Sequence, residues 1–178
     1  MTVRPETSEA GLSGIVTLSL YDRDGELIDE RVAKNLITDA GDLYYATRAI
    51  SAVSPAAPSD ATKVTGMKLG TGTTAASKAS TGAALVTYKT GSNLAFDASY
   101  PQISNLGSGL GVNAVYRCTW SAGVATDTAL TELVIVNDSS TNATSTAANS
   151  ISRVVFSAIN KGASDILVAT WNHKFLGA

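Results

Sequence analysis

The chain has 178 residues, a formal net charge of −2 and an isoelectric point near 5.3, so it has no basic excess for binding a phosphate backbone. We therefore expect no nucleic-acid partner for the chain as a whole. Only 16% of the residues are charged, and small polar residues take their place. Such a surface loses water at low cost when it meets another subunit, because hydroxyls and methyls are easier to dehydrate than charged groups.

The N-terminal residues and the cysteine content indicate synthesis in a reducing compartment. The chain begins MTVRPETSEAG, which is acidic where a secretory signal needs an apolar core, and no later run is long enough to span a membrane. Cys118 is the only cysteine, so the sequence contains neither a disulfide framework nor a cysteine pair for zinc. We expect residues 1–13 to form a polar arm and residues 14–178 to form a single domain.

Residues 14–32 predict a β-hairpin. Apolar and polar residues alternate from Val16 to Leu20, Asp24-Gly25 suits a turn, and a second run follows from Leu27 to Val32. Several carboxylates crowd this hairpin and faintly suggest a calcium loop, but the later oxygen ligands of such a loop do not follow. We therefore favour a solvated turn.

Residues 38–50 predict a short amphipathic helix. Thr38 or Asp39 can accept hydrogen bonds from the free N–H groups at the helix start, and Asp42 suits the positive end of the helix dipole. The expected apolar stripe consists of Leu43, Ala46 and Ile50, with Tyr44 and Tyr45 beside it. One helix of this length cannot bury its own core, so it should pack across the end or the open face of a sheet.

Residues 64–88 predict a short strand, 64–69, followed by a long loop rich in glycine, serine, threonine and alanine. Gly70-Thr71-Gly72 lacks the third glycine of a dinucleotide fingerprint, and no Gly-Lys-Ser/Thr follows it. We expect no nucleotide or other cofactor here. The low charge of the loop would instead let it fold over a neighbouring subunit.

The second half of the chain predicts strands separated by turns. In residues 112–120 the apolar side chains alternate and share one face of a strand, and Cys118 is a small hydrophobic residue on that face. Residues 129–137 have the pattern of a central strand that is buried on both faces. Residues 137–150 have no apolar period and predict an exposed loop, and two further strands, 151–160 and 165–175, complete the chain. The predicted fold is an antiparallel β-sandwich or jelly-roll-like barrel with one short capping helix near residues 38–50.

The titratable residues do not form a recognisable catalytic or metal-binding pattern. A hydrolytic triad would need His173, the only histidine, as its base, but His173 continues an alternating apolar face and suits a structural role better. Glu132 and Asp165 are isolated in sequence, so no pairing between them can be inferred. No spacing of metal ligands occurs. We therefore expect no catalytic, metal or cofactor residues.

The two tryptophans, Trp120 and Trp171, each lie on a predicted strand. Exposed indoles could stack on sugars, but tryptophan on a strand face is more often part of a core or an interface. We therefore expect both side chains in the core.

Four segments resemble a pattern found in small structural proteins of tailed bacteriophages. They are KNLITDAGDLYYATRAI, MKLGTGTTAASKASTGAALVTY, YRCTWSAGVATDTALTELVIVN and SRVVFSAINKGASDILVATWNHKF. In that pattern an Asn-Leu-Ile helix entry precedes a Gly-Thr-Gly loop, and the chain closes on two strands that end near a phenylalanine and a tryptophan. The match covers residues 34–176. The resemblance implies a virion protein without enzymatic activity, built on a β-sandwich.

Within a virion, the protein could belong to the head or to the tail. A single compact domain without a heptad pattern suits a head decoration or cement protein, made in the host bacterial cytoplasm and bound to the major capsid protein or other virion proteins. The alternative is a tail, baseplate or fibre-base component. A carbohydrate-binding module or a hydrolase is the alternative from a different class.

Tyr44 and Tyr45 suggest an oligomer contact. Neighbouring residues on a helix differ in direction by about 100°, so both tyrosines should not point into the same core. We expect one of them to face outward and to anchor an interface between copies, with a homotrimer on the particle as the expected assembly.

Overall fold

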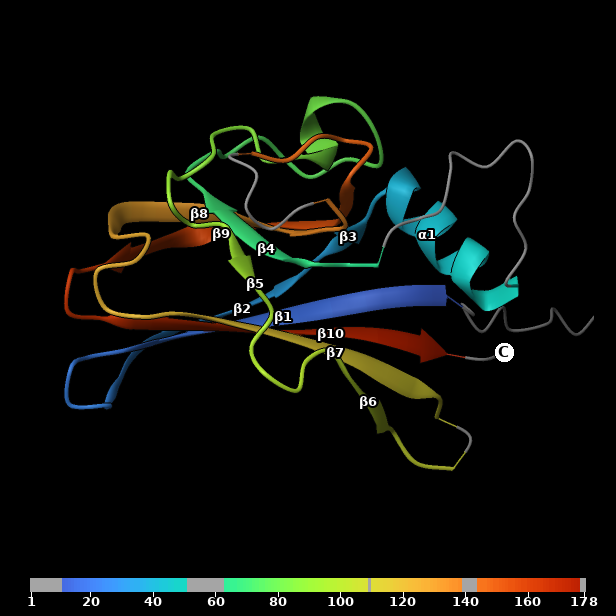
Figure 1. Ribbon diagram of the computed structural model, residues 1–178, viewed down its shortest axis with the longest axis horizontal. Helices are drawn as coiled ribbons and strands as arrows, with labels where there is room; N and C mark the ends of the chain where they lie inside the picture. Colours follow the sequence, from blue (N-terminus) through green and yellow to red (C-terminus); the bar gives the residue numbers. More distant parts are fainter. Residues whose placement is uncertain (1–10, 51–62, 109, 139–143, 177–178) are drawn as a thin grey trace, which may run out of the picture.

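The computed structural model describes residues 11–50, 63–108, 110–138 and 144–176, and it shows two five-stranded antiparallel sheets packed face to face (Figure 1). Sheet A has the order β2 (Leu27–Lys34), β1 (Gly11–Tyr21), β10 (Ile166–Leu176), β7 (Val112–Trp120) and β6 (Gln102–Asn105). Sheet B has the order β3 (Leu36–Ile37), β9 (Ser150–Lys161), β8 (Asp127–Val136), β4 (Gly66–Gly70) and β5 (Leu94–Ala95). The helix α1 (Asp39–Ile50) and a short 3-10 turn, η1 (Thr81–Ala83), complete the fold. The predicted β-sandwich with one short helix is confirmed.

The predicted first hairpin is formed by β1 and β2. The Asp22 carboxylate closes its turn by accepting hydrogen bonds from the backbone N–H groups of Asp24 and Glu26, each at 2.9 Å. Gly25 has a φ of +86°, which glycine adopts without steric cost. The solvated turn is therefore confirmed, and one of its carboxylates is used by the turn itself.

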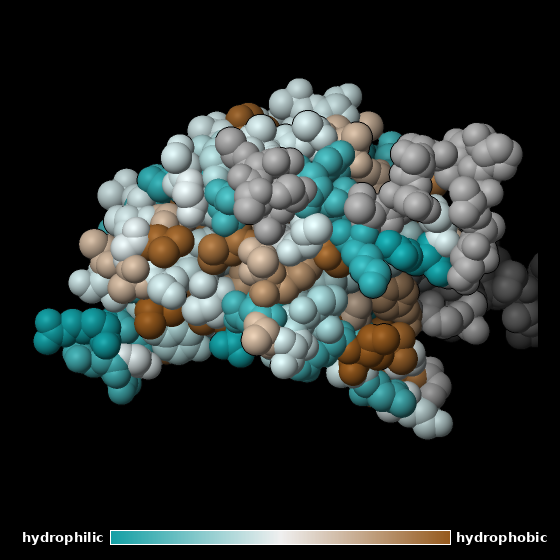
Figure 2. Space-filling model, viewed as in Figure 1, coloured by the Kyte–Doolittle hydropathy of each residue, from teal (hydrophilic) through white to brown (hydrophobic). Residues whose placement is uncertain are grey.

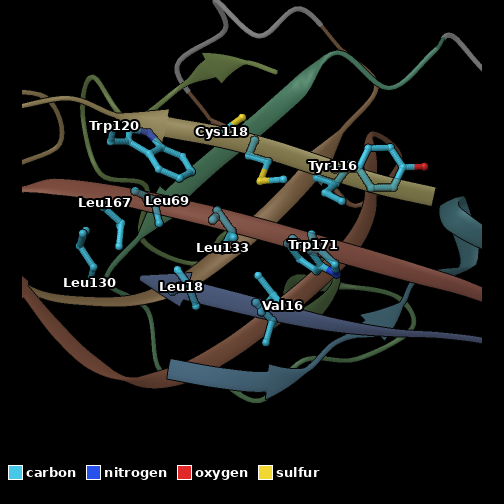
Figure 3. Close-up of a cluster of buried hydrophobic side chains, with 14 of the residues drawn as sticks. Val16, Leu18, Leu69, Tyr116, Cys118, Trp120, Leu130, Leu133, Leu167 and Trp171 are labelled. Atoms are coloured by element: carbon cyan, nitrogen blue, oxygen red, sulfur yellow. The ribbon is translucent and has the colours of Figure 1, made fainter. Parts of the chain in front are cut away.

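The core lies between the sheets, where side chains from β1, β7 and β10 meet those from β4, β8 and β9 (Figure 3). Trp120 and Trp171 are both fully buried there, so the predicted core position of each tryptophan agrees with the structure. Cys118 is also fully buried, and burial raises the pKa of its thiol. The two indoles and this thiol are packing groups.

The helix α1 lies at one end of the sandwich, next to β9 (Figure 1). The Thr38 hydroxyl accepts a hydrogen bond from the Gly41 N–H at 3.0 Å, so Thr38 is the N-cap residue, one of the two candidates. Gly41 packs so tightly that an added Cβ would lie 2.1 Å from the backbone oxygen of Ile151. Glycine is required here because the helix touches the backbone of β9.

The helix does not bury the predicted apolar stripe, so the prediction of its buried face is wrong. The buried helix face contains Gly41 and Tyr44, whereas Leu43 is 38% exposed and Ala46 is exposed. The close approach at Gly41 turns this face toward the sheet and rotates Leu43 away from it. The side chain of Ile50 lies outside the described residues.

The long loop after β4 folds over its own sheet, and the predicted contact with a neighbouring subunit stays a prediction. Residues 82–85 are buried against the outer side of sheet B, where Leu85 packs on Val134 and Val136 (Figure 1). The predicted exposed loop 137–150 is also partly covered, since the buried hydroxyl of Ser145 accepts a hydrogen bond from the Leu85 N–H. Residues 139–143 of that loop lie outside the described part.

The predicted arm and domain boundary differ slightly from the observed start of β1. Gly11 already pairs with Leu176 of β10, so residues 11–13 belong to sheet A and not to an arm. Residues 1–10 lie outside the described residues.

Candidate functional site

A buried polar cluster lies where the helix meets both sheets. His173 of β10 is fully buried, and its Nδ1 atom is hydrogen-bonded to the Tyr45 hydroxyl of α1. The Tyr45 hydroxyl also lies 3.0 Å from the hydroxyl of Tyr116 on β7. On the other side of the ring, His173 Nε2 lies 3.4 Å from Asn35 Nδ2. The cluster therefore joins the helix to three segments of the sandwich.

The donor groups in this cluster assign the protons. An amide nitrogen only donates, so Asn35 donates to His173 Nε2, and Nδ1 carries the ring proton that Tyr45 accepts. Burial strongly raises the pKa of Tyr45, so its hydroxyl keeps its proton in the contact with the Tyr116 hydroxyl. Burial also lowers the pKa of His173 to about 3, which keeps the imidazole neutral. Both ring nitrogens are used internally, and the predicted structural histidine agrees with this geometry.

The depressed pKa of His173 predicts a pH-dependent stability. The His173 imidazole is protonated only near pH 3 in the folded state, whereas in the unfolded chain it is protonated near its ordinary pKa of 6.5. Stability from this group is therefore fully present above pH 6.5 and is lost as the pH falls toward 3, by about 1.4 kcal/mol per pH unit. Urea unfolding of wild type and His173→Gln at about pH 7 and about pH 5 should show a smaller pH effect in the variant. An equal change of unfolding free energy with pH in wild type and His173→Gln would contradict the low pKa of His173.

The prediction that one of the two tyrosines faces outward is wrong. Tyr44 is only 8% exposed, and Tyr45 is partly buried and bonded to His173. The ring centroids of the two tyrosines lie 5.0 Å apart in an edge-to-face arrangement. The helix contacts β9 while Tyr45 reaches sheet A, so side chains that differ by about 100° in direction both meet protein.

A second polar cluster lies beneath the loop on sheet B. The Glu132 carboxylate of β8 forms an ion pair with Arg153 of β9 at 2.6 Å, and neither side chain is exposed to solvent. The same carboxylate accepts hydrogen bonds from the backbone N–H groups of Gly72, Val86 and Thr87, at 2.9, 3.1 and 2.8 Å. This carboxylate therefore holds the loop on the sheet.

Arg153 completes the same clamp from the other side. Its guanidinium donates to the backbone oxygens of Thr74 and Gly82, at 2.9 and 3.0 Å, in addition to its bonds with Glu132. Glu132 is isolated from other titratable residues in the sequence, and no motif marks Arg153. The available signal is a single charged residue inside each of two strand segments that are otherwise apolar or small and polar, 129–136 and 150–156.

Lys68 of β4 closes the remaining part of the outer side of sheet B. Its side chain is fully buried, and its ammonium group donates to the Asp138 carboxylate at 3.2 Å and to the backbone oxygen of Thr144 at 2.6 Å. These contacts hold the chain on both sides of residues 139–143. Sheet B is thus covered on its outer side by its own loops, each held by a buried charge.

The outer side of sheet A is less covered, because no described helix lies over it and the described loop 96–101 contacts it only at β7, where Asp97 bonds to Thr119 and Tyr100 lies next to Arg117 (Figure 1). We call its central part the open face. It consists of partly buried side chains on β1, β7 and β10, namely Ile15, Thr17, Ser19, Val115, Thr119, Val168, Thr170 and Asn172. The register places charged residues such as Lys34 and Lys174 toward its margins. Arg117 of β7 lies opposite Thr170 within this face, where it forms an ion pair with Asp97 at 3.2 Å. Apart from this pair, the open face is uncharged at its centre and rich in β-branched residues.

Among the residues that the structure describes, no group of three or more histidine, cysteine, aspartate or glutamate side chains could hold a metal ion. Within the same ranges, no helix has the length and apolar character needed to cross a membrane. Neither protein-family models, nor curated proteins, nor solved structures match this chain.

Proposed function

We propose that the chain is a non-enzymatic structural protein of a tailed-bacteriophage virion, which decorates the head by binding the major capsid protein lattice. The support is the resemblance of residues 34–176 to small tailed-phage structural proteins, together with the β-sandwich fold that this resemblance implies. On this proposal the protein is made in the host cytoplasm and functions on the virion.

The observation that carries this proposal is the difference between the two outer sides of the sandwich. Loops and buried charges seal sheet B, whereas sheet A presents the open face. Threonine, serine and valine side chains lose water at low cost compared with charged groups, so this face suits a large protein surface. The capsid lattice is the occupant that we propose for it.

A single domain without coiled-coil heptads favours decoration of the head over a fibre. A tail, baseplate or fibre-base component remains the alternative. Antibody labelling of particles from the source would separate the two, since label on heads supports decoration and label on tails supports the alternative. Particles that carry no label would contradict both. A major capsid gene next to this gene would favour decoration, and adjacent tail genes would favour the alternative.

Substitution at the open face tests the proposed contact. Thr17→Glu adds a carboxylate at the centre of this face, and we expect at least about tenfold weaker binding to particles, because a contact would have to remove water from that charge, and the cation across Thr170, Arg117, is already paired with Asp97. Thr90→Glu is the control, because Thr90 is an exposed loop residue outside the open face. Co-sedimentation with particles measures both variants. Equal binding by Thr17→Glu and wild type would contradict the contact.

The structure removes one supporting observation each from the homotrimer and from the carbohydrate-binding alternative. The homotrimer remains a proposal, but Tyr44 and Tyr45 do not supply an outward-facing contact for it. The carbohydrate-binding alternative lacks its proposed platform, since Trp120 and Trp171 are fully buried. Binding to a glycan array would still distinguish that alternative from a virion role.

A further inference from the structure

The strand β6 is an edge with an exposed apolar side chain. It is the last strand of sheet A, and all of its four residues are exposed. Ile103 in its middle is 82% exposed, and the adjoining residues Leu110 and Val112 are 60% and 39% exposed. Figure 2 shows hydrophobic atoms gathered at the lower right, over β6 and the start of β7.

The strand β6 and the residues next to it in the sequence carry no charge. Residues 98–116, which include β6 and most of β7, have no charged side chain. Charged residues on edge strands normally prevent pairing with other chains. The edge at β6 lacks this protection.

The opposite edge of sheet A provides the contrast. The strand β2 also exposes apolar side chains, and Leu27, Ile28 and Val32 are 53%, 52% and 64% exposed. However, four of its eight residues are charged: Asp29, Glu30, Arg31 and Lys34. The two edges of one sheet therefore differ in charge and not in exposed apolar residues.

We propose that β6 pairs antiparallel with β6 of a second copy, so that sheet A continues across a two-fold axis. An identical strand is the occupant that fits, because it has the same length and brings no charge to an uncharged edge. Backbone N–H and C=O groups of both strands supply the hydrogen bonds, and the two Ile103 side chains cover one another.

The contact is small, since β6 has only four residues, so pairing is weak in solution, with a dissociation constant on the order of micromolar or higher. The pairing involves an edge of sheet A and not the open face. It therefore stands or falls independently of the virion role.

Sedimentation velocity of the purified full-length protein over a range of concentrations tests the pairing. We expect a monomer–dimer equilibrium in wild type and at least about tenfold weaker association in Ile103→Lys, because a charge at this position must be buried on pairing. Val32→Lys is the matched control, because it adds the same charge to an exposed apolar residue on the other edge, and it should associate like wild type. Hydrogen exchange of residues 102–105 should slow as the wild-type concentration rises.

Three results would overturn the proposal. The first is a wild-type protein that stays monomeric at every concentration. The second is a dimer or trimer that forms equally well in Ile103→Lys. The third is association that Val32→Lys weakens and Ile103→Lys does not, which would place the contact at β2.

Discussion

Arg153→Met is expected to lower the free energy of unfolding by about 3 to 5 kcal/mol, because it leaves the buried carboxylate of Glu132 without its cation. The guanidinium bonds to Thr74 and Gly82 are lost as well, which removes two of the contacts that hold the loop on sheet B. Urea unfolding of wild type and variant measures the change. Adding Glu132→Gln to Arg153→Met should restore part of the loss, because the double variant has no unpaired buried charge.

An exposed ion pair near the same loop serves as the control. Lys78 bonds to Asp42 of α1, and the two side chains are 50% and 55% exposed. Lys78→Met should therefore cost less than about 1 kcal/mol, since solvent screens the pair. Similar losses in Lys78→Met and Arg153→Met would contradict the clamp.

Trp120→Ala and Trp171→Ala are each expected to destabilise the fold by about 3 to 5 kcal/mol, because each removes a fully buried indole from between the sheets. The two phenylalanine variants should differ. Trp120 Nε1 donates to the backbone oxygen of Ser92 at 2.7 Å, whereas Trp171 Nε1 is buried without a partner among the described residues. Trp120→Phe should therefore cost about 1 to 3 kcal/mol more for the oxygen it leaves unpaired.

Thermal and urea unfolding of the four tryptophan variants measures these losses of stability. A wild-type stability in either alanine variant would contradict the core position of that indole. Equal stability of Trp120→Phe and Trp171→Phe would contradict the role of the bond to Ser92.

The strands and the core could be predicted because they depend on local alternation. On β7, residues 116, 118 and 120 share a buried face, as their spacing predicts. The run on β8 is apolar on both sides and is buried on both sides, from Leu130 to Val136. Thr38 was one of the two predicted helix caps because the cap, too, is a short-range signal.

The polar clusters could not be predicted because their partners are far apart in sequence. Tyr45 and His173 meet across 128 positions, and Glu132 and Arg153 meet across 21. The direction of α1 was missed for a related reason, since it depends on the approach of Gly41 to the backbone of β9 and not on the helix's own apolar residues. The loop after β4 carries few charges, but its position is set by the buried carboxylate of Glu132 beneath it.

Amine labelling of free and particle-bound protein tests the proposed role most directly. Lys34 and Lys174 lie at the margins of the open face, while Lys78 is a half-exposed residue in the loop that follows β4. We predict that both marginal lysines lose reactivity on the particle while Lys78 keeps its reactivity. Loss of reactivity at Lys78 alone, or a protein that does not bind particles, would contradict the account.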